Sequence, residues 1–528
     1  MSSQSSGLQF YHPLAFWLGC LAITAGVLAH VPMFIHASYM DYQMVGMPMD
    51  NMMLGGMALI PLGLLLAMYG LMPRLDALRG QQSPLYFHIA DQIPLNRQHW
   101  TLVWVLLAAV IVDVMKPATL GFVMPGIKKE YEINSQTAGT LALVALTGTT
   151  IGSVIWGIVA DKFGRRAAIL LSALMFIGTA ICGAMPTFEW NLIMCFLMGM
   201  SAGGLLPITF TLMAETIPAA HRGWLLVALG GIGTAGGYLV AAGSAAVLEP
   251  MFSWRVLWLL GLPTGLLLIV LNRYMPESPR FLASQGLSGQ ARAVLARFGS
   301  AGHGEQDVVI EQQPQARGGI SQLFHAPYAG LSIGLLLAGV AWGLVNFGFL
   351  LWLPVNLGEL GFAAEASAII AKSALMAIPA VLLVIWLYHS WSSIKTLWLF
   401  LLLTALSLGS FVLFDFLQFY QPFWLSLAIA LLLVSASGVI AMLIPYAAEI
   451  YPVHLRASGS GLVAASSKFG GILGAGFGVL GWFSHIGGSA LAIGLALLVA
   501  ALVLQRKGIE TRGKALEDMH QALLEKTR

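Results

Sequence analysis

Two charged residues stand in the middle of a long apolar stretch. Residues 102–125 read LVWVLLAAVIVDVMKPATLGFVMP, in which Asp113 and Lys116 are three positions apart and Pro117 follows at once. A charge at the centre of a bilayer costs about 2.5–3.5 kcal/mol, so ionisable residues in membrane spans usually have a function. Burial favours the protonated form of the Asp113 carboxyl group, whereas a nearby lysine favours the ionised form. Asp113 could therefore take up and release a proton when its surroundings change. A structural pair on one helix face is the alternative.

The two lysines in apolar stretches could hold an anion. Lys116 could bind an anionic substrate or neutralise Asp113, and Pro117 could free a backbone carbonyl or kink the helix. Lys468, in GLVAASSKFGGILGAGFG, could give a carboxylate ligand a second cationic contact. Lys468 is also near enough to one end of its stretch to extend its amine into the interface.

Asn346 and Trp352, in AWGLVNFGFLLWLP, are further candidates for lining a substrate cavity. Ordinary helix packing would explain each of them equally well. We therefore predict Lys116, Asn346, Trp352 and Lys468 as substrate-binding residues and Asp113 as the proton-coupling residue.

The composition of the chain indicates an integral membrane protein. Of its 528 residues, 58% are hydrophobic and 9% charged, whereas soluble domains have about 25% charged residues. The net charge of +3 is too small and too scattered to indicate nucleic-acid binding. The three cysteines, all in apolar stretches, form no metal or redox spacing. The sequence shows no cofactor, metal or catalytic constellation, so we do not expect an enzyme.

Fourteen stretches have the roughly 20 apolar residues that a membrane-spanning helix needs. They lie near 14–34, 52–72, 101–124, 139–160, 167–186, 190–214, 224–247, 254–273, 329–354, 366–388, 396–416, 423–447, 460–483 and 486–505. The first is longer than the apolar part of a signal peptide and has no basic residue before it, so we expect it to be retained.

Basic residues predict the orientation of these spans. With the N-terminus in the cytoplasm, most Lys and Arg fall in cytoplasmic segments, which is the usual bias of membrane proteins. We therefore expect a multi-pass protein of the inner (plasma) membrane with both termini cytoplasmic. SGQARAVLARFG, in the polar segment between the eighth and ninth spans, is typical of a short amphipathic helix.

The sequence contains an internal repeat. AETIPAAHRG resembles AEIYPVHLRA, with Glu215 and Glu449 lying 234 positions apart, and PESPRFL pairs with IETRGKALE at a separation of 233. An even number of spans leaves the two copies in the same orientation, with a binding site expected near mid-membrane between them. The same separation pairs Asp113 with Asn346, so the repeat is asymmetric in charge.

Several motifs carry a family resemblance. GIVADKFGRR resembles the loop signature of the major facilitator superfamily, and WRVLW, PESPRFL, AEIYPVHLRASGSG and ETRGKALE are similar to its sugar-porter branch and the organic-ion relatives of that branch. The resemblance covers about residues 97–520. The second half departs from it, because IWLYHSWSSIK has no Asp, Gly or Arg pair where a second loop signature belongs.

The resemblance implies an all-α membrane protein with two six-helix bundles of the major facilitator fold, preceded here by an extra two-helix hairpin. The expected domains are 1–96 (hairpin and cytoplasmic linker), 97–273 (first bundle), 274–327 (cytoplasmic loop), 328–506 (second bundle) and 507–528 (cytoplasmic tail). From their position at the cytoplasmic ends of the spans, we expect a group of charged residues to form a gating cluster: Asp161, Arg165, Arg166, Glu215, Arg222, Glu449 and Arg456.

The function we expect is proton-coupled symport of a small organic anion, a carboxylate, by alternating access. A first-span Asp such as Asp113 is often the proton site in the symporters that the chain resembles. Sugar–proton symport is the close alternative, although the spans are poor in the Gln and Asn that sugars favour, and export of a drug or metabolite is another. The expected partners are the substrate, protons and the bilayer.

A function of another class rests on the loop HASYMDYQMVGMPMDNMM, residues 36–53. Methionine thioethers are soft ligands that favour Cu(I), so the chain could be a membrane sensor or a copper-handling accessory protein. The alternative is a flexible apolar lid.

Overall fold

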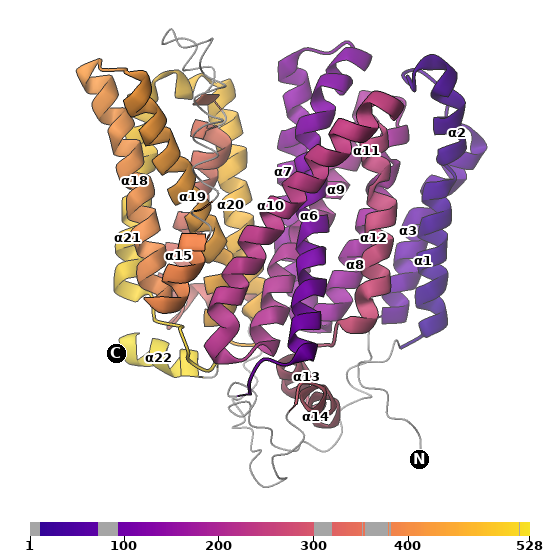
Figure 1. Cartoon of the computed structure of the whole chain (residues 1–528). Helices are drawn as coiled ribbons and strands as arrows, with labels where there is room; N and C mark the ends of the chain where they lie inside the picture. Colours follow the sequence, from indigo (N-terminus) through magenta and orange to yellow (C-terminus); the bar gives the residue numbers. More distant parts are fainter. Residues whose placement is uncertain are drawn as a thin grey trace. The chain divides into compact units, whose positions relative to one another are not determined.

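The computed structural model describes residues 11–71, 93–299, 319–350, 352–353, 379, 382–516 and 518–527. Within these ranges the chain forms helices joined by turns and contains no β-strand (Figure 1), which confirms the all-α prediction. Two compact units can be separated. Unit 1 comprises residues 1–218 and 232–316, and unit 2 comprises residues 219–231 and 317–528.

Unit 1 begins with helices from the extra N-terminal segment and continues with those of the first bundle. Its helices are α1 (Pro13–Leu28), α2 (Val31–His36), η1 (Ala37–Met40), α3 (Asn51–Leu71), α6 (Arg97–Glu130), α7 (Ser135–Phe163), α8 (Arg165–Gly178), η2 (Thr179–Ala184), α9 (Phe188–Thr216), α10 (Ala219–Phe252, its first part in unit 2), α11 (Val256–Leu259), α12 (Gly261–Leu271), η3 (Asn272–Tyr274), α13 (Pro279–Ser284) and α14 (Ser288–Arg297). The helix α14 confirms the short helix predicted in the polar segment.

Helices α1 and α3 pack against each other through glycine. Gly56, Gly63 and Gly70 recur every seven residues on α3, and Gly19 and Gly26 do so on α1. A Cβ atom on Gly19 would lie 2.5 Å from the carbonyl oxygen of Gly63, and one on Gly26 would lie 2.7 Å from that of Gly56. Small residues let helix backbones approach this closely where lipid gives no hydrophobic drive.

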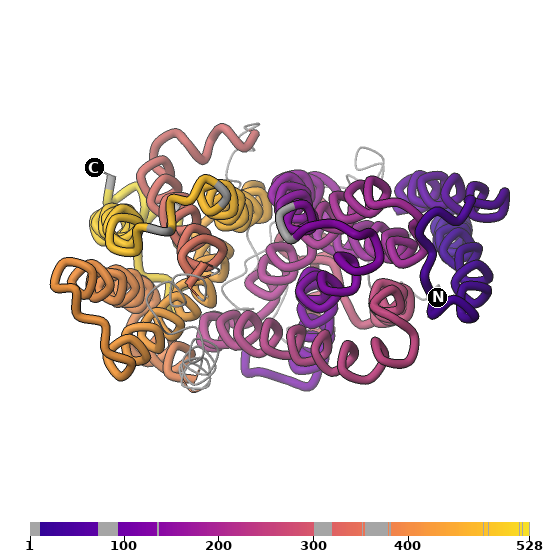
Figure 2. Tube along the Cα trace, turned by 90° about the horizontal axis from the view of Figure 1, so that it is seen from above, coloured from indigo at the N-terminus to yellow at the C-terminus, as the bar shows by residue number. Residues whose placement is uncertain are grey.

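The α1–α3 pair covers α8. Figure 2 shows these two indigo helices at one side of unit 1, and α8 contacts both of them as well as α9 and α12. As a result, 94% of the apolar window of α8 is buried, compared with 50% for α18, the helix that opens the corresponding span of unit 2. The extra helices therefore enclose a surface that unit 2 leaves open.

Unit 2 contains the second bundle and the tail. Its helices are the first part of α10, η4 (Ile320–Phe324), α15 (Ala329–Leu344), the π-helical turn η5 (Val345–Phe349), α18 (Ser393–Leu417), α19 (Pro422–Ile450), α20 (Arg456–Val479), η7 (Trp482–Ser484), α21 (Ile486–Lys507) and α22 (Asp518–Thr527). Residues 382–390 are also helical.

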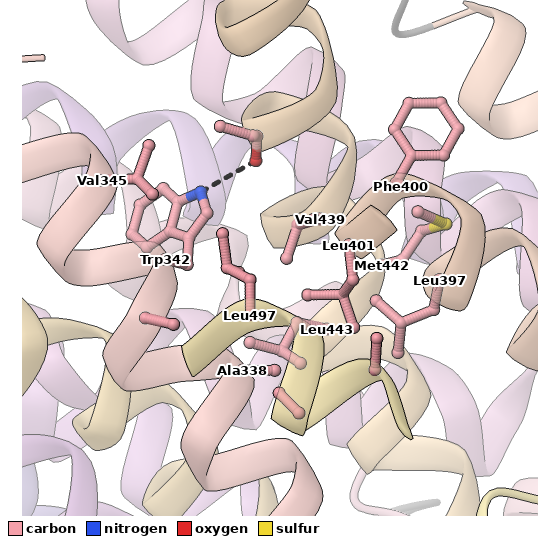
Figure 3. Packing of buried hydrophobic residues seen from close by; sticks show 14 of the residues in the cluster. Ala338, Trp342, Val345, Leu397, Phe400, Leu401, Val439, Met442, Leu443 and Leu497 are labelled. Atoms are coloured by element: carbon pink, nitrogen blue, oxygen red, sulfur yellow. Dashed lines mark hydrogen bonds between the residues drawn. The ribbon is translucent and has the colours of Figure 1, made fainter. Parts of the chain in front are cut away.

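The core of unit 2 is built where α15, α18, α19 and α21 meet. Figure 3 shows Ala338 and Trp342 of α15 facing apolar residues of the other three helices. The indole N–H of Trp342 donates to the carbonyl oxygen of Ala436 at 2.8 Å. A buried indole usually needs such an acceptor, because leaving the N–H without one is costly.

Twelve helical stretches among the described residues are long and apolar enough to cross a membrane. The predicted span 366–388 lies largely outside the described residues, and the one at 460–483 is occupied by α20, whose Gly- and Ser-rich sequence is not among the twelve. The count of fourteen therefore stays a prediction.

Candidate functional site

Asp113 lies in the middle of α6, which starts at a strong N-terminal cap. The Asn96 side chain accepts hydrogen bonds from the N–H groups of Gln98 and His99, and the Asn96 N–H donates to Nδ1 of His99. The helix continues through Pro117 without interruption. Because proline has no N–H, the Asp113 carbonyl four residues earlier loses its helical partner. The Asp113 side chain itself is only 4% exposed.

Lys116 points into the interior of unit 1. Its Nζ donates to the carbonyl oxygen of Phe176 at 2.8 Å and to Oγ1 of Thr179 at 2.6 Å, and it lies 4.2 Å from the centre of the Phe176 ring. These contacts place a cation at the C-terminus of α8, where helix carbonyls lack partners and the helix dipole is negative. Its hydrogen bonds thus go to α8 and η2 and not to Asp113.

This placement bears on the predicted role of Lys116. Lys116 as a whole is 1% exposed, and a Cβ atom on Gly261 of α12 would lie 2.8 Å from the Lys116 amine. The contacts therefore favour a structural role in joining α6, α8 and α12. A substrate contact by Lys116 stays a prediction.

Lys468, Asn346 and Trp352 are brought to one region of unit 2 by α20 and the end of α15. The Lys468 Nζ lies 5.6 Å from the centre of the Phe347 ring, at the limit of a cation–π contact. Asn346 and Phe347 lie in the π-turn η5, where the N–H of Leu350 donates to the carbonyl oxygen of Val345. Single π-turns inside helices occur often at functional sites.

Glycines of α20 make room for these side chains. The Phe347 ring packs against Gly471, and the Trp352 indole packs against Gly478, where a Cβ atom would collide with it. The Trp352 indole nitrogen is buried and has no hydrogen-bond partner within the described part of the chain. Lys468 places its charge beside an aromatic ring, that of Phe347. Substrate binding by Lys468, Asn346 and Trp352 stays a prediction.

Three of the predicted gating residues form a buried cluster in unit 1. The Arg165 guanidinium donates to both carboxylate oxygens of Glu215 at 2.9 Å and lies 3.2 Å from Asp161. Arg165 and Glu215 are fully buried, and such a two-pronged pair fixes orientation as well as charge. The fourth residue, Arg166, instead donates from Nε to the side-chain oxygen of Asn272 at 2.7 Å.

Glu277, the acidic residue of the PESPRFL motif, completes this cluster. Its carboxylate accepts from the backbone N–H groups of Arg165 at 2.8 Å and Arg166 at 3.2 Å, the first two of α8. Gly164 precedes them at φ 109°, and its missing Cβ leaves room for Glu277. Burial raises the pKa of Glu277, although the Ser278 N–H and the charge of Arg165 oppose that shift.

The remaining gating residues, Arg222, Glu449 and Arg456, lie in unit 2. Arg222 donates to the carbonyl oxygen of Lys514 at 3.2 Å and interacts electrostatically with Glu449. Arg456 donates from Nε to the carbonyl oxygen of Tyr451 at 2.9 Å. Gating by all seven residues stays a prediction.

Hydroxyl groups surround Glu449, where unit 1 has a guanidinium beside Glu215. Glu449 accepts from the Tyr388 hydroxyl at 2.9 Å and from Thr511 Oγ1 at 2.7 Å. Glu510 accepts from the backbone N–H of Ser393, the first residue of α18, at 3.0 Å. It also accepts from the hydroxyls of Ser392 and Ser393. Burial tends to raise the pKa of Glu510, but these hydrogen bonds outweigh it and lower the pKa.

A second buried ion pair, at the other end of unit 1, was not predicted. Arg255 Nη2 lies 2.7 Å from Glu130, and Nη1 donates to the carbonyl oxygens of Gly183 and Met185 at 3.0 and 2.9 Å. Tyr131 donates to Met185 and accepts from Arg255, and burial raises the pKa of Tyr131 to about 12. The WRVLW motif contains Arg255, but its sequence does not indicate that the acidic partner of Arg255 is Glu130.

The methionine-rich loop packs onto this network. The Met44 N–H donates to Glu130 at 2.7 Å, and the side chains of Met33, Met44 and Met53 are buried in one hydrophobic cluster with Phe34. Among the described residues no group of three or more His, Cys, Asp or Glu could hold a metal ion. The contacts support the interpretation of the loop as an apolar lid.

Known proteins resemble this chain over most of its length. The niacin transporter NiaP of Acinetobacter baylyi is 27% identical over 436 residues, covering 81% of this chain and 98% of that protein. The 4-hydroxybenzoate transporter PcaK of Pseudomonas putida is 28% identical over 454 residues, covering 80% and 96%. A structure of the proton:xylose symporter XylE aligns with a TM-score of 0.64 at 18% identity, covering 80% of this chain and 99% of that one, which shows the shared fold.

The family follows from the sequence as well as from the fold. The model of the Major Facilitator Superfamily matches residues 105–475, which is more than half of the chain and includes both Glu215 and Glu449. The chain therefore belongs to the Major Facilitator Superfamily, in its sugar-porter and organic-ion branch, and is a multi-pass membrane transporter and not an enzyme.

Proposed function

We propose that this transporter carries a small aromatic carboxylate together with protons. The observation that carries the proposal is the position of Lys468 beside Phe347 in unit 2, with the buried Trp352 indole N–H close by in sequence. A lysine supplies charge for a carboxylate and the aromatic side chains supply faces for a ring. Nicotinic acid and 4-hydroxybenzoic acid, named in the relatives NiaP and PcaK, are both aromatic monocarboxylic acids.

Asp113 carries the proton in this mechanism. It is the buried carboxyl group in the middle of the first bundle helix α6, and its counterpart in the repeat is the neutral Asn346. Protonation of Asp113 removes a charge from the membrane interior, so it lowers the cost of the conformational change. Lys468 then holds the substrate carboxylate, and the two units rock about the bound substrate by alternating access.

The charged clusters at the ends of the spans would act as gates. Arg165 and Glu215 hold α8 and α9 together, and Glu449 is joined to the tail through Thr511. In the proposal these contacts, with Arg222 and Arg456, stabilise one end state and break in the other. The gate lies on the cytoplasmic side of the inner membrane, with both termini cytoplasmic.

The test is uptake into proteoliposomes that are alkaline inside. Labelled nicotinate and 4-hydroxybenzoate should accumulate, whereas nicotinamide, which replaces the carboxylate by a neutral amide, should not. A protonophore should abolish accumulation but leave exchange across the membrane. Accumulation of xylose in place of both carboxylates would establish the sugar alternative, and accumulation that survives the protonophore would contradict proton coupling.

A further inference from the structure

A pocket outside the transport machinery lies in unit 2, at the end of the bundle where the C-terminal tail folds back. It has a volume of about 710 Å³ and is lined by the first turns of α18, the end of α21 with the segment after it, and α22. Trp391, Ile394, Lys395 and Trp398 form the α18 wall. Ile394, Lys395 and Trp398 share one face of α18, and Trp391 lies just before that helix. None of them belongs to the proposed substrate or gating residues.

The polar side of this pocket is cationic. Lys395, Lys514 and Lys526 line it from three different segments. Among the described residues, the amines of Lys395 and Lys514 make no hydrogen bond or ion pair, and the Lys526 amine donates to the carbonyl oxygen of Gly508. Burial and the nearby charge of Lys507 lower the pKa of Lys526, which shows that positive charge is crowded here.

Two acidic residues, Glu510 and Glu525, also line the pocket, but only one of them is available to neutralise the lysines. Glu510 is already engaged by the hydroxyls of Ser392 and Ser393 and by the N–H groups of Ser393 and Arg512. That leaves Glu525 as the other carboxylate of the lining. Three amines therefore face one carboxylate that is not held by other hydrogen bonds among the described residues.

The apolar side of the pocket suits a lipid. The candidate span Ser393–Leu417 begins at the pocket and the candidate span Ile486–Lys507 ends there. The pocket therefore lies at the level where a bilayer meets water. Trp and Lys are the residues that gather at this level. The tail helix α22 buries Met519 and Leu523 against the bundle while Leu524 is 42% exposed, which is the pattern of a helix lying in the interface.

We propose that this pocket, the α18–α22 pocket, binds the headgroup of an anionic phospholipid. The phosphate is held by Lys395, Lys514 and Lys526, and the start of the acyl chains lies along Trp391 and Trp398. The bound lipid fastens the tail helix α22 to the first turn of α18. Binding is thus expected to stabilise unit 2 without contact to transported substrate.

The test compares nanodiscs of phosphatidylglycerol with nanodiscs of phosphatidylcholine. The wild-type protein should unfold at a higher temperature in phosphatidylglycerol, and the variant Lys395→Gln/Lys514→Gln/Lys526→Gln should lose that difference. Near an anionic surface each lysine contributes about fivefold in affinity, so lipid titration in detergent should weaken by about two orders of magnitude in the triple variant. The control variant Arg97→Gln/Lys129→Gln/Lys162→Gln removes the same charge from exposed sites of unit 1 and should keep the difference.

A second measurement does not depend on folding of the lysine variant. Phosphatidylglycerol with brominated chains should quench tryptophan fluorescence more than brominated phosphatidylcholine, and Trp391→Phe/Trp398→Phe should remove the excess. Equal stabilisation by both lipids, an unchanged difference in the triple lysine variant, or the same saturable shift with free glycerol phosphate would each overturn the proposal.

Discussion

Glu277 and Glu510 hold the same place in the two units. Each carboxylate lies beyond the span that ends its bundle and accepts hydrogen bonds from the N-terminal N–H groups of the helix that opens the third bundle span. Glu277 does so for α8 and Glu510 for α18. The N-terminus of a helix attracts anions, since its first N–H groups lack partners. The repeat thus preserves a helix cap, while the residues around that cap differ.

The two caps should respond to pH with opposite sign. The pKa of Glu510 is lowered, so its contribution to stability is present above the ordinary value of 4.5 and is lost as pH falls through the folded value. The pKa of Glu277 is raised from 4.5, so its contribution is present at lower pH and declines as pH rises through the folded value. Glu510→Gln should cost about 0.5–1 kcal/mol at pH 7 and nothing at acid pH. The stability of Glu277→Gln relative to wild type should increase as pH rises. Unfolding curves between pH 3.5 and 7.5 measure both variants. If the stability differences of the two variants from wild type changed in the same direction with pH, the opposite pKa shifts of Glu277 and Glu510 would be contradicted.

Substitution of Lys116 and Lys468 should separate a structural role from a substrate-binding role. Lys468→Met removes the charged partner of the substrate carboxylate, which corresponds to about tenfold or more in nicotinate affinity. Lys116→Met should leave that affinity unchanged, because its amine is held by Phe176 and Thr179. Equilibrium binding of labelled nicotinate measures both. A loss in Lys116→Met alone would establish the sequence-based prediction for Lys116 and overturn the one drawn from its contacts.

Asp113→Asn should uncouple transport from the proton gradient. The amide cannot release a proton, so uptake driven by an alkaline interior should fall to the level reached without a gradient. Exchange of labelled for unlabelled substrate should continue, because the neutral amide resembles the protonated carboxyl group. The conservative Asp113→Glu variant should retain part of the coupled uptake. Undiminished accumulation in Asp113→Asn would remove Asp113 from the mechanism.

Two glycine substitutions test the close packing of α1 against α3, one at Gly19 inside the contact and one at Gly55 outside it. Gly19→Ala places a Cβ atom 2.5 Å from the Gly63 carbonyl oxygen, and overpacking of this kind costs about 1–3 kcal/mol. Gly55→Ala places one where nothing lies within 4 Å, so its better helix propensity should leave stability equal or higher by up to about 1 kcal/mol. Thermal unfolding in detergent compares them. Equal losses in both variants would show that the close contact does not limit stability.

Loss of Glu130 should leave the Arg255 guanidinium buried without its acid. Removing one partner of a buried pair costs about 3–5 kcal/mol, so Glu130→Ala should unfold far more easily than wild type. Glu189→Ala, an exposed acid in the first turn of α9, should cost less than about 1 kcal/mol. Because Met44 donates to Glu130, chymotrypsin should also cut the methionine-rich loop faster in Glu130→Ala. Unchanged cleavage would show that the loop is held by its apolar contacts alone.

The sequence was sufficient for features that depend on periodicity and on motifs. Apolar length predicts most of the helices, and the two Glu pairs at nearly one separation predict the correspondence that Glu277 and Glu510 display. The family resemblance was confirmed by the match over residues 105–475. These features are readable because each is encoded by neighbours in the chain or by similar segments.

Side-chain contacts between residues far apart in the sequence could not be predicted from periodicity or motifs. Lys116 is three residues from Asp113, yet its amine reaches the end of α8, 60 positions later. The sequence does not show which helix end lies within its reach. Similarly, the sequence shows that the segment before Ser393 lacks the Arg pair of the loop signature. The hydroxyls of Tyr388 and Thr511 that donate to Glu449 are visible only in the fold.

The π-turn Val345–Phe349 sets the direction of the Trp352 side chain that follows it. An α-helix advances about 100° per residue, and a π-turn accommodates one additional residue. The helix beyond Leu350 is therefore rotated by about 100° relative to an uninterrupted α15. Deleting one residue within the turn would restore the α-helical phase and rotate Trp352 away from Gly478, so the angular setting of this aromatic wall depends on a single inserted residue.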